Sequence, residues 1–334
     1  MNVSVCIPTY NQSAFIENAI KSAYNQTVMP FEIIIFDDCS TDDTMIVLNK
    51  LATQIPSLKI FKQKINVGIS MNVDACLRAA SGELIIRLDS DDCLSPFYIE
   101  KLTQELKNNP HAGYAHAAVQ EIDQNGNFLK KRILARKSGY QNDSDALIAM
   151  TSGFRVAANI LMFKKEALEK VGFIVSKTNF AEDYYLIASL AVAGYGNVYL
   201  NEVLSYYRVW IDVKQIRKRR KLDEIIGYRK LFEEVLEPAY LKKNWNKSIL
   251  IRRKTLFACN HADCLASNVF TNEEKIKLKK ELYKLSIATR TKIIIWLYLN
   301  GFGNSLIFFK KLKFFIKTLI KSIIWRNTTN KLAD

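Results

Sequence analysis

The first 110 residues alternate short apolar runs with amphipathic segments, and this alternation constrains the fold more than any other feature. Strands that alternate with helices of about 10 to 15 residues are typical of a mainly parallel sheet with right-handed crossovers. We therefore expect an α/β fold. The expected strands are residues 3–7, 32–36, 58–61 and 83–88, and the expected helices are residues 13–26, 41–54 and 69–80.

The pattern changes after residue 110, where residues 113–122, the turn at residues 123–126 and the residues from Asn127 onward predict a β-hairpin. Two later helical segments stop at Gly172 and Gly194, since glycine commonly ends a helix. From about residue 213 the sequence is helical and basic. The helices expected before that point are residues 164–171 and 181–193, and the strands that follow them are residues 198–200 and 203–209.

Charge divides the chain into two parts. Residues 1–210 hold 20 Lys and Arg against 22 Asp and Glu, whereas residues 211–334 hold 28 against 11. Such an asymmetry indicates two parts with different surroundings. We expect a catalytic domain over residues 1–212 and a basic helical region over residues 213–334 that meets an anionic surface.

Cysteine usage bears on the compartment. The six cysteines form no CxxC pair, and the N-terminus has no basic stretch followed by an apolar core. We therefore expect no secretory signal and no disulfide framework, and we expect the chain in the reducing cytoplasm.

The sequence Asp89-Ser90-Asp91-Asp92 follows an apolar run that reads as a buried strand. Carboxylates crowded at the end of such a strand repel one another unless a cation lies among them. Hard oxygen ligands suit Mg²⁺ or Mn²⁺ better than zinc. The cluster therefore predicts a divalent-metal site for a phosphorylated substrate. The alternative is a turn that caps a helix beginning at Ser95-Pro96.

Three more polar segments follow expected strands, at residues 8–11, 37–42 and 66–72. In a parallel sheet the ends of these strands share one edge, which is where ligands bind in open α/β folds. A fourth segment, Glu182-Asp183, opens an expected helix. We expect these segments and the carboxylate cluster to form one site.

In this order and spacing, the motifs resemble those of a family-2 glycosyltransferase with the GT-A nucleotide-sugar fold. The resemblance covers about residues 1–210 and implies a Rossmann-like sheet with helices on both faces. It also implies inverting, metal-dependent transfer of a sugar from a nucleotide-sugar donor to a hydroxyl. The motifs are PTYN, DDCSTD, NVG, DSDD, FKKEALEKVGF, AED and YYR.

The resemblance implies that the first two loops hold the nucleotide. Thr9 and Asp38 can hydrogen-bond the base, Tyr10 can stack on it, and an aspartate that accepts a uracil N–H favours a UDP-linked donor. The alternatives are an ordinary strand-end turn for Thr9 and Tyr10, and a helix cap near Thr41 for Asp38. The implied nucleotide-sugar-binding residues are Pro8, Thr9, Tyr10, Asp38, Asn66, Gly68, Asp89 and Arg208.

The same resemblance implies a separate role for each carboxylate. Asp91 ligates Mn²⁺ or Mg²⁺, Asp89 contacts the ribose or the metal, and Asp92 is either an outer carboxylate or a helix cap. Asp183 is the general base that deprotonates the acceptor hydroxyl. The alternative for Asp183 is that acidic residues simply favour a helix N-terminus.

Arg208 is expected to pair with the donor diphosphate. Two departures from the family pattern accompany it. Trp210 stands where many relatives carry a histidine, and Met71 stands where they often carry an arginine. Each departure removes one phosphate, metal or acceptor contact that the resemblance would otherwise imply.

Residues 305–325 predict an amphipathic helix that lies on an anionic membrane surface. A membrane-spanning segment and a packed helical subdomain are the alternatives. We expect no nucleic-acid partner, because lysines lie opposite the large apolar residues instead of alternating with them. The lysines on one face are Lys310, Lys311, Lys313, Lys317 and Lys321, and the apolar face carries Leu312, Phe315, Ile316, Leu319, Ile320 and Ile323.

Together these features predict a hexosyl- or N-acetylhexosaminyltransferase of surface polysaccharide synthesis, peripheral on the cytosolic face of the membrane. Its acceptor would be a growing glycan, free or lipid-linked. One alternative is a sugar-nucleotide nucleotidyltransferase, although the first loop lacks the glycine-rich phosphate loop of such enzymes. The other is a non-catalytic membrane-bound scaffold that keeps the fold.

Overall fold

A computed structural model describes residues 1–174, 180–210, 216–306 and 308. The chain divides into two compact units. The first consists of Met1–Lys214 and Ile226–Leu250, and the second of Gln215–Ile225 and Ile251–Asp334. The domain boundary near residue 212 stays a prediction, and the first unit also takes in the segment from 226 to 250.

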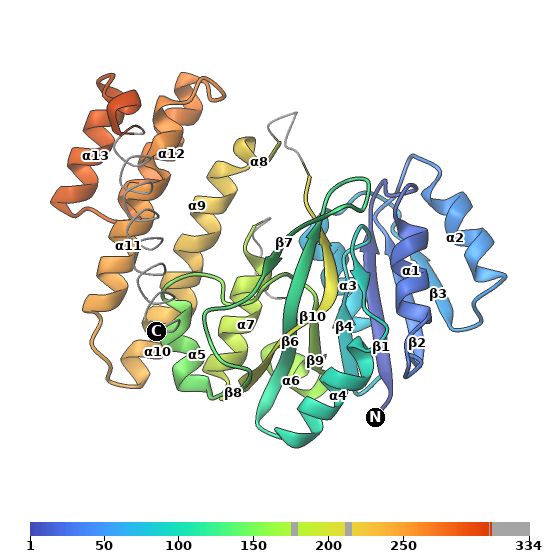
Figure 1. Ribbon diagram of the computed structural model, residues 1–334. Helices are drawn as coiled ribbons and strands as arrows, with labels where there is room; N and C mark the ends of the chain where they lie inside the picture. The colour runs from blue at the N-terminus through green and yellow to red at the C-terminus, as the bar shows by residue number, and fades with distance from the viewer. Residues whose placement is uncertain (175–179, 211–215, 307, 309–334) are drawn as a thin grey trace, which may run out of the picture. The chain divides into compact units, whose positions relative to one another are not determined.

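The described strands of the first unit form one mixed sheet in the order β3-β2-β1-β4-β9-β6-β10-β5, with β7 beside β6 and β8 beside β10 (Figure 1). Four neighbouring pairs are parallel, namely β1–β2, β2–β3, β1–β4 and β6–β10. The strands are β1 Val3–Thr9, β2 Glu32–Asp37, β3 Leu58–Lys62, β4 Leu84–Arg87, β5 Cys93–Leu94, β6 Ala112–Ile122, β7 Phe128–Arg132, β8 Gly139–Gln141, β9 Leu161–Lys164 and β10 Gly196–Arg208.

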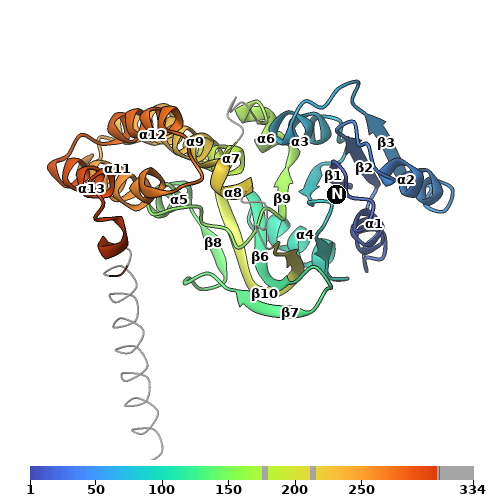
Figure 2. The same ribbon diagram turned by 90° about the horizontal axis from the view of Figure 1, so that it is seen from above.

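Helices cover both faces of this sheet, because successive strand residues point to opposite sides. Val5 and Ile7 pack with α1 and α4, whereas Cys6 packs with α3 and α6 on the other face (Figure 2). The predicted α/β fold with a mainly parallel sheet is therefore confirmed. The helices are α1 Ile16–Tyr24, α2 Thr44–Ala52, α3 Ile69–Arg78, α4 Tyr98–Asn108, α5 Asp143–Met150, α6 Lys165–Val171, α7 Glu182–Val192 and α10 Glu237–Lys242, with a π-helix at Leu231–Leu236.

One local expectation was wrong. The two short strands expected at 198–200 and 203–209 are a single strand, β10. Its pairing with β6 shifts register after Leu200 and again after Val203. Bulges of this kind keep a strand paired through an irregular stretch, and so β10 reaches the sheet edge at Arg208 unbroken.

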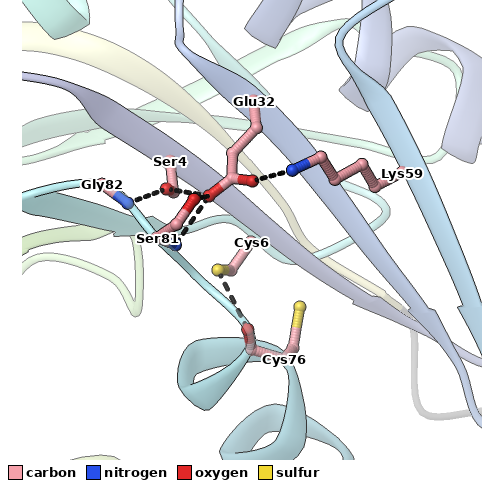
Figure 3. A network of polar contacts seen from close by, with 7 residues as sticks. All are labelled: Ser4, Cys6, Glu32, Lys59, Cys76, Ser81 and Gly82. Atoms are coloured by element: carbon pink, nitrogen blue, oxygen red, sulfur yellow. Dashed lines mark hydrogen bonds and ion pairs between the residues drawn. The ribbon is translucent and has the colours of Figure 1, made fainter.

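A buried carboxylate fixes the other end of the strands, where β2 begins (Figure 3). Oε1 of Glu32 accepts hydrogen bonds from Ser4 Oγ at 2.6 Å and from the backbone and hydroxyl of Ser81 at 2.7 Å each. Oε2 accepts from Lys59 Nζ at 2.7 Å. Burial alone would raise the pKa of Glu32, but these donors outweigh it and lower the pKa to about 2. This network joins β1, β2, β3 and the turn before β4.

The second unit has its own small core, in which Leu278, Leu282 and Ile295 are fully buried. Thr271 and Glu274 form a capping box at the start of α12, which satisfies two backbone N–H groups. None of the helices among the described residues is both long and apolar enough to cross a membrane. The remaining helices of the described residues are α8 Ile216–Arg219, α9 Lys221–Lys230, α11 Ser248–His261, a 3₁₀-helix at Ala262–Ala266, α12 Asn272–Leu285 and α13 Thr289–Leu299.

Candidate functional site

The loops after β1 and β2 are tied together at the carboxyl edge of the sheet. The backbone N–H of Asn11 donates to Ser40 Oγ at 2.9 Å, and Asn11 Oδ1 accepts from the N–H of Thr41 at 2.8 Å. Asn11 and Cys39 have φ angles of 53° and 62°, a left-handed conformation that is uncommon outside glycine. Contacts between the loops therefore hold both turns in a conformation with an intrinsic cost.

Asp38 joins this pair of loops to the loop after β3. Its Oδ1 accepts from the N–H of Val67 at 2.7 Å, and its Oδ2 accepts from the N–H of Gly68 at 2.9 Å. Asn66 Nδ2 donates to the carbonyl of Asp38 at 3.2 Å. Three predicted site residues, Asp38, Asn66 and Gly68, thus lie together. Asp38 is not the cap of α2. The first backbone N–H of that helix, Thr44 N–H, donates to Oδ1 of Asp42 at 3.0 Å instead.

Thr9 has a buried hydroxyl that lacks a hydrogen-bond partner in the described part of the chain. The side chain is buried at the end of β1. Pro8, one residue earlier, is buried within the strand, and Tyr10 is 45% exposed. A buried hydroxyl without a partner is costly, so the arrangement suits a ligand that supplies one.

The carboxylate loop at residues 89–92 follows β4 on the same edge. Burial, with added repulsion from Asp89, raises the pKa of Asp91 despite a hydrogen bond from Trp210. Burial, followed by repulsion from Asp91 and Asp89, raises the pKa of Asp92 well above its usual range. Oδ2 of Asp92 is buried and has no hydrogen-bond partner in the described part of the chain. The carboxylates of Asp91 and Asp92 are therefore buried close to other negative charges without enough positive charge nearby to balance them.

The donor set of this loop fits a hard divalent cation, because it consists of carboxylate oxygens. Within the described residues, no three His, Cys, Asp or Glu side chains surround one metal position. A cation held by Asp91 and Asp89 would therefore need further ligands from outside this set, and the oxygens of a diphosphate would suit it.

Arg208, at the end of β10, lies against the carboxylate loop. Its backbone N–H donates to Asp92 Oδ1 at 2.7 Å, and its Nε donates to the Asp91 carbonyl at 2.9 Å. Its Nη1 donates to the carbonyls of Asp123 and Gln124 at 2.8 and 3.1 Å. The side chain is buried, and so it holds the loop in place. The predicted contact with a diphosphate stays a prediction.

Asp183 lies in the first turn of α7, next to Glu182, which is connected to the carboxylate loop through Arg87. The Arg87 guanidinium pairs with Asp89 at 3.3 Å and with Glu182 at 3.7 Å. Burial and then the Glu182 charge raise the pKa of Asp183 to about 7, even though Arg87 opposes the rise. A carboxylate with a pKa near neutrality is suited to accept and release a proton.

Arg87 was missed from the sequence, whereas Glu182 was expected in the site but was given no role of its own. Arg87 is a single cation inside the apolar run of β4, and a buried arginine requires carboxylate partners. That signal was available, but only the fold shows that one of the partners comes from α7, which is 95 residues further along the chain.

A family model described as "Glycosyl transferase family 2" matches residues 4–172. The chain is similar to the "Chondroitin synthase" of Escherichia coli, with 32% identity over 193 residues, which covers 58% of this chain and 27% of that protein. It is also similar to the "GalNAc(5)-diNAcBac-PP-undecaprenol beta-1,3-glucosyltransferase" of Campylobacter jejuni, with 34% identity over 177 residues, covering 51% of this chain and 54% of that protein. The chain thus matches only part of either relative.

Solved structures share the fold. The S. aureus TarS 1-349 complex with UDP-GlcNAc matches with a TM-score of 0.57 and 15% identity, covering 90% of this chain and 92% of that one. The mannosyltransferase PcManGT from Pyrobaculum calidifontis, in complex with GDP-Man and Mn²⁺, matches with a TM-score of 0.53 and 19% identity, covering 91% and 86%.

Proposed function

Because this chain belongs to glycosyl transferase family 2, we propose that it is an inverting, metal-dependent enzyme of surface polysaccharide synthesis. It transfers a hexose or N-acetylhexosamine from a nucleotide sugar to a glycan hydroxyl. The observation that carries this proposal is the pairing of Arg87 with both Asp89 and Glu182, which ties the carboxylate loop to the residue just before Asp183. Thr9 and Asp38 lie on the same edge of the sheet.

Asp183 is the base in this proposal. An inverting transfer needs one carboxylate that takes the acceptor proton as the hydroxyl attacks the anomeric carbon. The pKa of about 7 keeps a substantial fraction of Asp183 ionised at neutral pH while leaving it basic enough to accept the proton. Glu182 is buried and paired with Arg87, and so it is less accessible to an acceptor.

Asp91 and Asp89 are the residues that would hold Mn²⁺ or Mg²⁺ at the donor diphosphate. When bound, the cation neutralises the charge that develops on the leaving nucleoside diphosphate. Arg208 and Asp92 keep the loop in place through the hydrogen bond from Arg208 N to Asp92 Oδ1. The Mn²⁺ in the PcManGT complex supports this reading through the shared fold.

The donor nucleotide occupies the loops held by Asp38 and Thr9, and we favour UDP. TarS binds UDP-GlcNAc on the same fold, while PcManGT binds GDP-Man. Asp38 is committed to two backbone N–H groups, but a carboxylate has lone pairs left for a uracil N–H. Tyr10 is exposed enough to stack on the base.

The acceptor in this proposal is carried by a lipid at a cytosolic membrane face, as the printed name of the Campylobacter jejuni relative suggests for that enzyme. The predicted amphipathic helix at residues 305–325 falls almost entirely outside the described residues. The described part of the second unit supports membrane binding independently. Its described residues hold 15 Lys and Arg against 6 Asp and Glu, whereas the described residues of the first unit hold 24 against 25.

Helix α13 exposes a large apolar surface on this basic unit. Ile293 and Trp296 are 53% and 56% exposed, and the ring of Phe302 stacks on Trp296 with centroids 6.1 Å apart. Ile293 and Trp296 border an open, mainly apolar pocket of about 740 Å³. By helical geometry, Arg290 and Lys292 flank the Ile293–Trp296 face on either side, as cations do at lipid headgroups. A symmetric contact with a second copy would bring like charges together.

The proposed function is tested by transfer with purified protein, a panel of UDP- and GDP-sugars, and Mn²⁺ or Mg²⁺. The wild-type chain should release a nucleoside diphosphate only with a divalent cation. Asp183→Asn should lose at least 100-fold in transfer, because general base catalysis contributes about that much. Asp145→Asn, an exposed carboxylate at the start of α5, is the matched control. Full transfer by Asp183→Asn would exclude Asp183 as the base.

A further inference from the structure

Trp210 contacts the carboxylate that we assign to the metal. Its indole Nε1 donates to Oδ2 of Asp91 at 2.5 Å. The residue lies two positions beyond the end of β10, where the family pattern would place a histidine. An indole N–H donates a hydrogen bond but has no lone pair with which to ligate a metal. Trp210 therefore cannot replace the histidine as a ligand, and another role must account for its contact.

The indole is itself held by packing. The Phe15 ring meets it edge-on, with centroids 5.1 Å apart and planes at 89°. The Arg208 guanidinium lies 4.6 Å from the centroid of the same Phe15 ring, and Arg208 Nε donates to the Asp91 carbonyl. Two residues at and just after the end of β10 thus bind Asp91. Arg208 donates to the backbone carbonyl of Asp91, and Trp210 donates to its carboxylate.

We propose that Trp210 is the positioning residue of the metal site, which fixes Oδ2 of Asp91 and leaves Oδ1 to the divalent cation. This inference rests on the proposed function, because it takes Asp91 as a metal ligand. A neutral donor orients the carboxylate without cancelling its charge, whereas a lysine or arginine at the same place would compete with the cation. Hydrogen bonds to a ligating group commonly raise metal affinity by 10- to 100-fold.

The first test is Mn²⁺ affinity of the full chain, measured from free Mn²⁺ by electron paramagnetic resonance with UDP present. Trp210→Phe keeps an aromatic ring against Phe15 but removes the N–H, and it should weaken Mn²⁺ binding at least tenfold. Trp210→Met is a second variant without the donor, in case the first fails to fold. Trp245→Phe, which removes an indole that packs on Tyr240, should bind Mn²⁺ as the wild type does.

The second readout is tryptophan fluorescence during titration with diamagnetic Mg²⁺. The difference between wild type and Trp210→Phe isolates the Trp210 signal, and it should change as Mg²⁺ saturates the site, because the carboxylate that accepts the N–H becomes metal-bound. A purely packing role would leave that signal unchanged. Equal or tighter Mn²⁺ binding by both donor-free variants, or a Trp210 signal insensitive to Mg²⁺, would overturn the inference.

Asp91→Asn separates this inference from the function on which it rests. If Asp91→Asn loses Mn²⁺ binding while the Trp210 variants keep it, Asp91 is a ligand and only the role of Trp210 is refuted. If Asp91→Asn binds Mn²⁺ like the wild type, the metal assignment itself fails, and the inference about Trp210 fails with it.

Discussion

The guanidinium of Arg87 lies 3.7 Å from the carboxylate of Glu182, and both side chains are buried. The same guanidinium lies 3.3 Å from Asp89. One cation thus joins the carboxylate loop after β4 to the first turn of α7, where Asp183 is found. Burial raises the pKa of Asp183 most, the charge of Glu182 raises it further and Arg87 lowers it. A change to either charge should therefore move the pH at which the proposed base works.

Transfer should rise with pH through about 7 in the wild type, because Asp183 must be ionised to accept a proton. Replacing Arg87 by Met removes the cation that opposes the rise in pKa, so the acidic limb should move to higher pH. The measurement is kcat/KM against pH. Arg87→Lys keeps the charge and should shift the limb less. A limb that stays in place for Arg87→Met would refute the coupling.

Glu182→Gln should move the same limb in the opposite direction. It removes the negative charge that, after burial, raises the pKa of Asp183 most, so ionisation should be complete at lower pH. Glu234→Gln, whose carboxylate accepts from the hydroxyl of Tyr185 on the same helix, is the control. Parallel shifts for Arg87→Met and Glu182→Gln would contradict the electrostatic explanation, since the two substitutions remove opposite charges.

The edge on which the site lies could be predicted because residue type and chain order encode it. The carboxylates at 89–92 and the loop containing Asp38 each follow an apolar strand, and parallel strands end on one edge. The contacts between distant segments could not be predicted in the same way. The donation of Trp210 to Asp91 spans 119 residues, and it depends on a strand, β10, that the sequence divided in two. The alternation of apolar and polar residues does not reveal where the register of a strand shifts, so such a strand cannot be traced from the sequence.

Stability should depend on Glu32, whose pKa is lowered to about 2. A depressed carboxyl pKa stabilises the fold above the pKa of the unfolded chain, and this contribution disappears as pH falls from about 4.5 towards 2. The shift corresponds to about 3 kcal/mol. Glu32→Gln should therefore lower the free energy of unfolding in urea by about that amount at pH 7, and the difference from wild type should shrink below pH 4.

The control for Glu32 is Glu83→Gln, since Glu83 is an exposed carboxylate whose Oε2 accepts from the N–H of Asn2. Exposed pairs of this kind contribute little to stability, so this variant should unfold near the wild-type denaturant concentration. A difference between Glu32→Gln and wild type that stayed constant from pH 7 to pH 3 would show that ionisation of Glu32 is not the source of the stabilisation.

Membrane binding should depend on the apolar face of α13. The double variant Ile293→Asp, Trp296→Asp places two negative charges on the face that we propose enters the lipid. It should reduce sedimentation with phosphatidylglycerol-containing vesicles at least tenfold. Binding to pure phosphatidylcholine vesicles should be weak for every variant, because the basic unit then lacks its anionic counterpart. Transfer to a water-soluble acceptor should be unchanged, since both residues lie in the second unit.

The matched control replaces Ile46, which is 69% exposed on α2 of the first unit, by Asp. This variant should sediment with vesicles like the wild type, because it changes an exposed apolar residue outside the basic unit.

A chain whose Trp210, Trp245 and Trp325 are replaced by Phe retains Trp296 as its single tryptophan, and brominated lipids should quench its emission. Absence of quenching, with sedimentation intact, would show that the membrane contact lies elsewhere than on α13.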